Sequence, residues 1–253
     1  MTRPPMRADR WTAWALLLLC CGPAAAWAQS PLAAEIRAVA TRYHEDPARI
    51  DTLRESMAHA AASDPQVETL LALAQIAFLF GDVRARTTEE KLAAYEQGRQ
   101  AAHRAAELDP RNARAHFWYA TNAGRWGQTK GVVRSLFLLP EVKRGMETAI
   151  ELDPRFAPAY VLAGTVYYEV PGLFGGDLEK SEAYFRRGLA VDAHHTGLRV
   201  GLARTLIKRG RPADARRELQ AVLDEKAPSN AADWTVKDVG AARALLATLP
   251  AGS

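Results

Sequence analysis

Cysteine is scarce in this sequence: the only two are adjacent, at positions 20 and 21. If residues 1–28, which contain both cysteines, are removed, the remaining chain has no disulfide, no thiol nucleophile and no thiolate metal site. The sequence also contains no Gly-x-Ser-x-Gly or His-Glu-x-x-His motif. The pair His194-His195 has no third ligand at a suitable spacing. The sequence therefore predicts no catalytic residues, no metal and no other cofactor.

Basic runs with interleaved aromatic residues are also missing. The formal net charge is +4, and part of that surplus comes from Arg3, Arg7 and Arg10 at the start of the chain. The remainder is close to neutral, so the charge does not favour a nucleic acid as the partner.

Residues 1–28 have the pattern of a secretory signal peptide. A basic start is followed by an apolar run, and Ala26-Trp27-Ala28 provides a small-x-small cleavage site. The run is too short to remain as a transmembrane helix. We predict cleavage after Ala28, a periplasmic protein and a single domain over residues 29–253. Lipidation of Cys20 or Cys21 is disfavoured, though not excluded, because neither cysteine follows a small residue.

The rest of the chain repeats itself. The stretches AAELDPRNARAHFWYA (105–120), AIELDPRFAPAYVLAG (149–164) and GLAVDAHHTGLRVGLA (188–203) align, and AAASDPQVETLLALA (60–74) is a weaker copy. A period of roughly 40 to 45 residues is typical of stacked supersecondary units. In two of the copies a leucine ends an amphipathic helix and Asp-Pro stops it, since proline cannot donate a backbone hydrogen bond. No segment alternates with the period of a strand, so the fold class is all-α.

The pattern resembles tetratricopeptide repeats. That family has a small residue ten positions after the turn proline, and Ala120, Gly164 and Ala203 match it. The resemblance implies an α-solenoid of about four helix-turn-helix units. Long insertions between paired helices are predicted at 81–90, 124–141 and 171–180. Asp233 to Leu249 is predicted to form a C-terminal capping helix.

The segment GRWGQTKG (124–131) is the least regular part of this pattern. It does not fit a phosphate-binding P-loop, because only two residues separate its first glycines and it follows a helix rather than a strand. We interpret GRWGQTKG and PGLFGGD (171–177) as loops that cover one mouth of a groove. Glycines permit the sharp turns that such loops need. An alternative is that both loops only close unusually long repeats.

The concave positions of successive repeats form a mostly apolar wall with a few polar groups, as in a ligand or peptide groove. The predicted ligand-binding residues are Phe117, Thr121, Arg125, Trp126, Lys130, Val161, Thr165, Tyr168, Phe174 and Arg204. Glu169, Val200 and Lys208 occupy further concave positions. Trp126 and Phe174 are expected at the rim, and Arg125 and Lys130 are expected to meet an anionic group. The alternative for the aromatics is that they are core, because an aromatic on a repeat helix is more often buried.

A narrower resemblance rests on AHFWYA, GRWGQTKG, the LDP turn and PGLFGGD, within residues 90–210. These segments resemble the T component (TatT) of tripartite ATP-independent periplasmic (TRAP) transporters. The resemblance implies a non-enzymatic accessory protein. It would bind or conduct a small, partly apolar or amphipathic ligand and dock a periplasmic solute-binding protein of a TRAP system. The alternative is a tetratricopeptide scaffold that binds a protein or peptide in its groove, and a homo-oligomer remains open.

Overall fold

The computed structural model describes residues 30–250, and its regular structure is entirely helical. The predicted signal peptide, both cysteines and the last three residues lie outside the described part. The first half contains α1 (Pro31–Arg42), α2 (Arg49–Ser63), α3 (Val67–Leu79), the π-helical η1 (Phe80–Arg84), α4 (Thr88–Leu108), α5 (Ala113–Lys130) and α6 (Val132–Leu152). The second half contains α7 (Ala157–Glu169), the short 3₁₀ helix η2 (Gly172–Phe174), α8 (Leu178–Val191), α9 (Thr196–Lys208), α10 (Pro212–Asp224), α11 (Ala231–Asp233), the π-helical η3 (Trp234–Asp238) and α12 (Val239–Thr248).

The helices pack as consecutive pairs, α3 with α4, α5 with α6, α7 with α8 and α9 with α10. These are the four helix-turn-helix units predicted from the repeat, and the α-solenoid is confirmed. α1 and α2 precede the first unit. The C-terminal helix α12 packs against α10 and η3, where a capping helix is expected.

The turns between units follow directly from the Asp-Pro signature. Asp109 ends α4, and its backbone N–H donates to the carbonyl of Ala105 at 2.9 Å. Asn112 then caps α5, because its side-chain oxygen accepts from the backbone N–H of Arg114 at 3.2 Å. Asp153 has the same place at the end of α6, where its carboxylate accepts from the N–H of Arg155 at 2.9 Å.

Small residues lie where paired helices approach most closely. Ala120 and Ala203 are fully buried. A Cβ atom built on Gly164 would lie 2.6 Å from the ring of Phe185, on the partner helix α8. Across the α5–α6 pair, a Cβ on Gly145 would lie 2.8 Å from the Cβ of Ala120. The small positions predicted from the repeat are therefore set by helix contact.

The insertions differ from the prediction. Residues 124–130 continue helix α5, so GRWGQTKG is not a loop, and 132–141 already belong to α6. The turn between these helices is confined to Gly131, which has φ of +114°, a value that favours glycine. The segment 81–90 contains η1 and a capping box of Thr87 with Glu90. Only 171–177 is largely loop, with η2 inside it.

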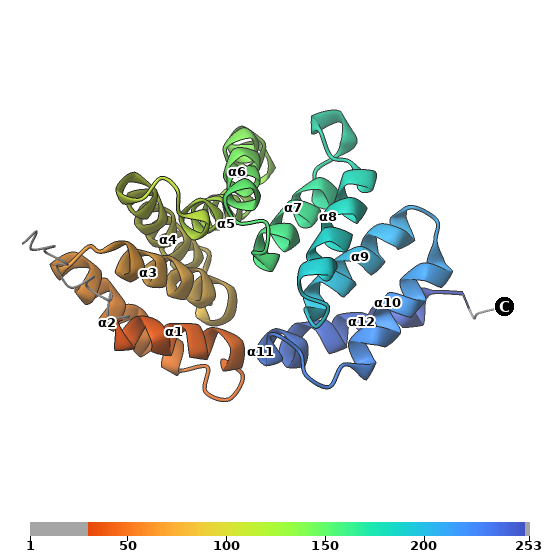
Figure 1. Cartoon of the computed structure of the whole chain (residues 1–253), viewed down its shortest axis with the longest axis horizontal. Helices are drawn as coiled ribbons and strands as arrows, with labels where there is room; N and C mark the ends of the chain where they lie inside the picture. Colours follow the sequence, from red (N-terminus) through yellow and green to blue (C-terminus); the bar gives the residue numbers. More distant parts are fainter. Residues whose placement is uncertain (1–29, 251–253) are drawn as a thin grey trace, which may run out of the picture.

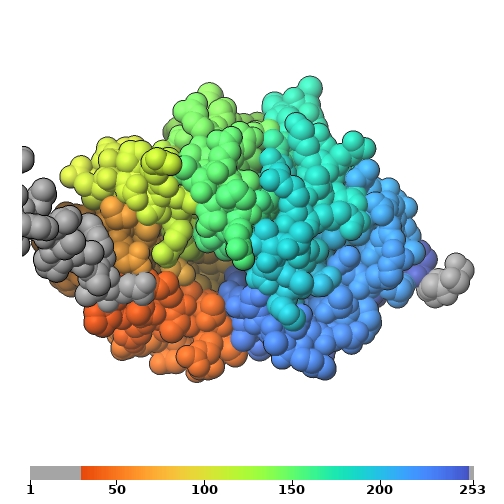
Figure 2. Space-filling view, viewed as in Figure 1, coloured from red at the N-terminus to blue at the C-terminus, as the bar shows by residue number. Residues whose placement is uncertain are grey.

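The two ends of the solenoid meet (Figure 1). Helix α1 packs against α11, so the described chain curls almost into a ring. The amide of Asn230 donates to the carbonyl of Ala40 at 3.4 Å, and the Tyr43 hydroxyl donates to Asp233 at 2.9 Å. The space-filling view shows the N-terminal and C-terminal segments in contact along the lower edge (Figure 2).

Candidate functional site

The concave side was predicted to form a groove with one mouth covered by two loops, but the first two predicted residues, Phe117 and Thr121, lie in the core. Phe117 is 7% exposed, and its ring meets that of Phe156 edge-on, with centroids 5.0 Å apart. Thr121, one turn later on α5, is buried, and its hydroxyl has no hydrogen-bond partner among the described residues. For Phe117 the alternative of a structural role fits the contacts better than a ligand contact.

Arg125 is the next concave position on α5, and it is engaged within the chain. Its guanidinium forms an ion pair with Asp82 of η1 and lies 5.6 Å from the centroid of the Tyr95 ring. On its other side, Asp82 pairs with Lys237 of η3 at 3.0 Å. Because Arg125 is held by this shared carboxylate, it is not a free anion-binding cation.

These side chains form a cluster that we call the clasp: Tyr43, Asp82, Arg125, Asp233 and Lys237. Lys237 pairs with Asp233 at 2.9 Å as well as with Asp82, so it joins η3 to the N-terminal half. The Asp82 side chain is only 14% exposed. Burial alone would raise the pKa of its carboxyl, but Arg125 and Lys237 together hold the pKa below its ordinary value. The clasp therefore keeps Asp82 ionised and closes this part of the concave side.

Sequence reasoning missed the clasp. Asp82 and Lys237 are 155 residues apart, the first within a repeat unit and the second after the last unit, so no local spacing links them. Only weak signals in the sequence pointed to this cluster: Asp82 is an acid in a predicted insertion, and Lys237 is a lysine in the predicted capping helix. Both lie in π-helical turns, which are rare and often occur at functional positions.

The second half of the concave side is more accessible. Tyr168 lies at the end of α7, half-buried, with two cations of α9 against its ring. The Lys208 ammonium is 3.7 Å from the ring centroid, and the Arg204 guanidinium is 4.7 Å from it. Cations at these distances are attracted by the ring's negative face. Three concave repeat positions thus lie together: Tyr168 on α7, and Arg204 and Lys208 on α9.

Two further features complete this surface. Arg204 also pairs with Glu169 at 3.2 Å, but both side chains are more than 40% exposed, at 44% and 46%. An ion pair of this kind contributes little and can be displaced. Thr165 lies one turn before Tyr168 and is half-buried, while Val161 packs against the core at the start of the same face. We call Val161, Thr165, Tyr168, Arg204 and Lys208 the α7–α9 face.

The predicted rim residues lie elsewhere. Trp126 and Lys130 are on the last turns of α5, with the Lys130 ammonium 5.5 Å from the indole centroid. Phe174 is in η2, half-exposed, at the turn between α7 and α8. These residues belong to the outer turns of two neighbouring units rather than to the α7–α9 face. The expectation that GRWGQTKG forms a loop over the groove is wrong, because that segment is helical.

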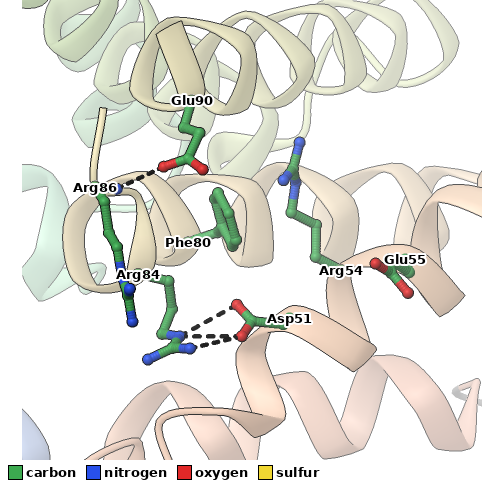
Figure 3. A pocket seen from close by; sticks show the side chains of 7 residues that line it. All are labelled: Asp51, Arg54, Glu55, Phe80, Arg84, Arg86 and Glu90. Atoms are coloured by element: carbon green, nitrogen blue, oxygen red, sulfur yellow. Dashed lines mark hydrogen bonds and ion pairs between the residues drawn. The ribbon is translucent and has the colours of Figure 1, made fainter. Parts of the chain in front are cut away.

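A surface pocket of about 400 Å³ lies between α2, η1 and the start of α4, and no predicted site residue lines it (Figure 3). Arg84 makes hydrogen bonds to Asp51, including one of 2.8 Å, and the Arg54 guanidinium lies 4.3 Å from the centroid of the Phe80 ring. Glu90 accepts hydrogen bonds from the backbone N–H groups of Arg86 and Thr87. The pocket holds three acids and three arginines, so its charges balance and select no particular ion.

Comparison with known proteins agrees with the helical-repeat fold and identifies different relatives from those predicted. A sequence profile described as "Regulator of microtubule dynamics protein 1-3" matches residues 34–174. A tetratricopeptide repeat profile matches residues 175–234. No curated protein sequence matches the chain.

Similar solved structures are tetratricopeptide-like proteins. TTC0263, a thermophilic protein of Thermus thermophilus, is 20% identical with a TM-score of 0.60, covering 83% of this chain and 98% of its own. PilF of Pseudomonas aeruginosa is 16% identical with a TM-score of 0.51, covering 86% and 88%. At these identities the likeness concerns the fold alone.

The resemblance to the TRAP T component is therefore wrong. The regulator and repeat profiles between them match residues 90–210, the region on which that resemblance rested. Two of the segments that carried it are explained by the repeat architecture: LDP forms the turn between units, and GRWGQTKG extends α5. The predicted partner, a solute-binding protein of a TRAP system, has no support from these relatives.

Proposed function

This chain belongs to the regulator of microtubule dynamics protein 1-3 family, and we propose that it is a scaffold that binds a segment of another protein. The binding surface is the α7–α9 face. The observation that supports this proposal is the accessible Tyr168 ring, flanked by Lys208 at 3.7 Å and Arg204 at 4.7 Å. The chain acts by binding and not by catalysis.

The chemistry of the face defines the partner segment. Tyr168 offers a flat, partly apolar surface, and aromatic residues contribute strongly to binding at protein interfaces. Arg204 and Lys208 are exposed cations that lie over this ring. A carboxylate of the partner would displace Glu169 from Arg204 at little cost, because that ion pair is exposed. The partner segment thus carries an acidic side chain next to an apolar one.

The clasp restricts where this segment lies. Asp82, Arg125 and Lys237 occupy the concave side near the first and last elements of the ring. Phe117 is unavailable because it is packed against Phe156. The bound segment therefore contacts α7 and α9, and not the concave positions of α3 and α5.

Site-specific photo-crosslinking tests the proposal. A photoreactive amino acid at Thr165, on the α7–α9 face, is compared with one at Arg217, whose side chain on α10 is 74% exposed. We expect Thr165 to capture one protein whose crosslinked peptide contains an acidic residue, and Arg217 not to capture it. The peptide is then synthesised and titrated against the chain.

Two results would overturn this function. One is an identical set of crosslinked proteins at Thr165 and Arg217, which would show that the chain does not bind a partner specifically through the α7–α9 face. The other is a small-molecule mass retained in native mass spectrometry and lost in Tyr168→Ala, which would assign the face to a ligand instead of a protein.

A further inference from the structure

A second surface goes beyond the proposed function. Five large apolar side chains are exposed at two neighbouring turns. Phe137, near the start of α6, is 75% exposed, and Leu173 in η2 is 90% exposed. We call the whole set the apolar rim: Val132, Val133, Phe137, Leu173 and Phe174. Exposed apolar side chains gathered in this way are typical of interaction sites.

Both parts of the apolar rim project from the same side of the molecule. The turn between α5 and α6 and the turn between α7 and α8 lie next to each other at the top of Figures 1 and 2. Lys143 of α6 fixes the second turn in place, because its ammonium donates to the carbonyl of Gly175 at 2.8 Å. A flat surface could therefore touch both turns together.

The charges beside the α5–α6 turn are positive. No aspartate or glutamate occurs between Asp109 and Glu141, whereas Lys130 and Arg134 lie at the turn itself. Both cations are placed over Trp126, at 5.5 and 5.7 Å from the indole centroid. Glu141, the first acid of α6, is occupied by the Tyr119 hydroxyl. Apolar side chains, a tryptophan and basic residues on one face are the composition of segments that lie in a membrane interface.

A second copy of this chain fits the same surface less well. In a symmetric dimer the same patch meets itself, so the positive charges of Lys130 and Arg134 from both copies would be brought into one interface. No acid within residues 110–140 would neutralise them. An anionic bilayer provides both the apolar phase and the countercharge. Within residues 30–250, no helix has both the length and the apolar composition of a membrane span.

We propose that the apolar rim docks the protein on the surface of a bilayer that contains anionic phospholipids. Phe137, Val133 and Leu173 enter the boundary between headgroups and acyl chains. Lys130 and Arg134 contact the phosphates, and Trp126 lies at headgroup depth.

Vesicle co-sedimentation of the full chain tests this docking, with phosphatidylcholine vesicles prepared with and without phosphatidylglycerol. The rim variant is Phe137→Ser with Leu173→Ser. The matched control is Leu108→Ser with Val191→Ser, which replaces two exposed apolar residues at turns between units, 49% and 38% exposed. The charge variant is Lys130→Gln with Arg134→Gln.

We expect the wild type and the control to bind phosphatidylglycerol vesicles alike, and the rim variant to bind roughly tenfold more weakly or worse. The charge variant should lose the preference for phosphatidylglycerol. Equal binding by the wild type and the rim variant would overturn the proposal. So would a dimer, seen by analytical ultracentrifugation without vesicles, that the rim variant dissociates, because the rim would then be an interface between copies.

Discussion

Lys237 donates a hydrogen bond to Asp82 at 3.0 Å, across 155 residues of sequence. This contact joins the π-helical turn after α3 to the π-helical turn before α12. Arg125 approaches the same carboxylate from α5. One acid, whose side chain is 14% exposed, thus holds three separate parts of the solenoid and closes the ring.

Replacing Asp82 with Asn should loosen that closure. Lys237 and Arg125 would then face each other without their shared carboxylate, and removing one partner of a buried ion pair is costly. Since both cations are partly exposed, we expect a loss of about 1–3 kcal/mol in the free energy of unfolding, less than for a fully buried pair. Hydrogen exchange should rise mainly in residues 231–248.

Asp51→Asn is the control for that variant. Asp51 pairs with Arg84, but its side chain is 36% exposed, so the loss should stay below about 1 kcal/mol. If the Asp51 and Asp82 variants lost the same stability, or if exchange rose evenly along the chain, Asp82 would have no special role in closing the ring.

Asp238 should make stability depend on pH. Burial raises the pKa of its carboxyl from 3.8 to about 6, although the Thr196 hydroxyl donates to it at 2.7 Å. Between these values the folded chain keeps a proton that the unfolded chain has lost, so stability falls as pH rises from about 4 to about 6. The upper limit for this loss is ~3 kcal/mol.

Asp238→Asn cannot ionise, so its free energy of unfolding should lack this decline. Urea unfolding of the wild type and the variant at several pH values measures the difference. A difference between the two proteins that stays constant from pH 4 to pH 7 would show that the carboxyl of Asp238 has an ordinary pKa in the folded chain.

Two glycines in helices should respond oppositely to alanine. At Gly164 a new Cβ would be 2.6 Å from Phe185, so Gly164→Ala should destabilise the fold by ~1–3 kcal/mol. At Gly124 the nearest atom is 3.8 Å away, on Val142, and alanine has the higher helix propensity. Gly124→Ala should therefore stabilise by up to ~1 kcal/mol. If Gly124→Ala were less stable than the wild type, Gly124 would lie in a glycine-dependent turn rather than in a helix.

Substitutions at Phe117 and Tyr168 should distinguish a core residue from a binding residue, although both occupy concave repeat positions. Phe117→Ala removes a buried ring and should cost ~3–5 kcal/mol. Tyr168→Ala removes a half-exposed ring and should weaken partner binding with a smaller loss of stability. Thermal unfolding and partner titration of both variants make the comparison. Equal thermal losses with unchanged binding would place Tyr168 in the core.

The sequence repeat determines which parts of the fold and of the candidate site could be predicted. Asp109, Asn112 and Gly164 act through neighbours in the same or the next helix, so a period in the sequence is enough to assign them. The contact between Asp82 and Lys237 depends on the curvature of the stacked units. This curvature is the sum of many small rotations between neighbouring helices, so it leaves no local pattern in the sequence. Tyr168 and Arg204 were predicted as neighbours on the concave side because both occupy repeat positions, and their side chains do lie together. Phe117 shares such a position but is buried by Phe156, a contact that no spacing reveals.

Isothermal titration of the peptide captured at Thr165 tests the central claim most directly. The chain is compared with Lys208→Gln, which removes one of the two cations over Tyr168, and with Arg217→Gln on α10. We predict that Lys208→Gln weakens binding roughly twofold to fivefold, the loss of one exposed charge contact with the acidic side chain of the partner, and that Arg217→Gln leaves it unchanged. Equal affinities for the wild type and Lys208→Gln would contradict a protein-binding face on α7 and α9.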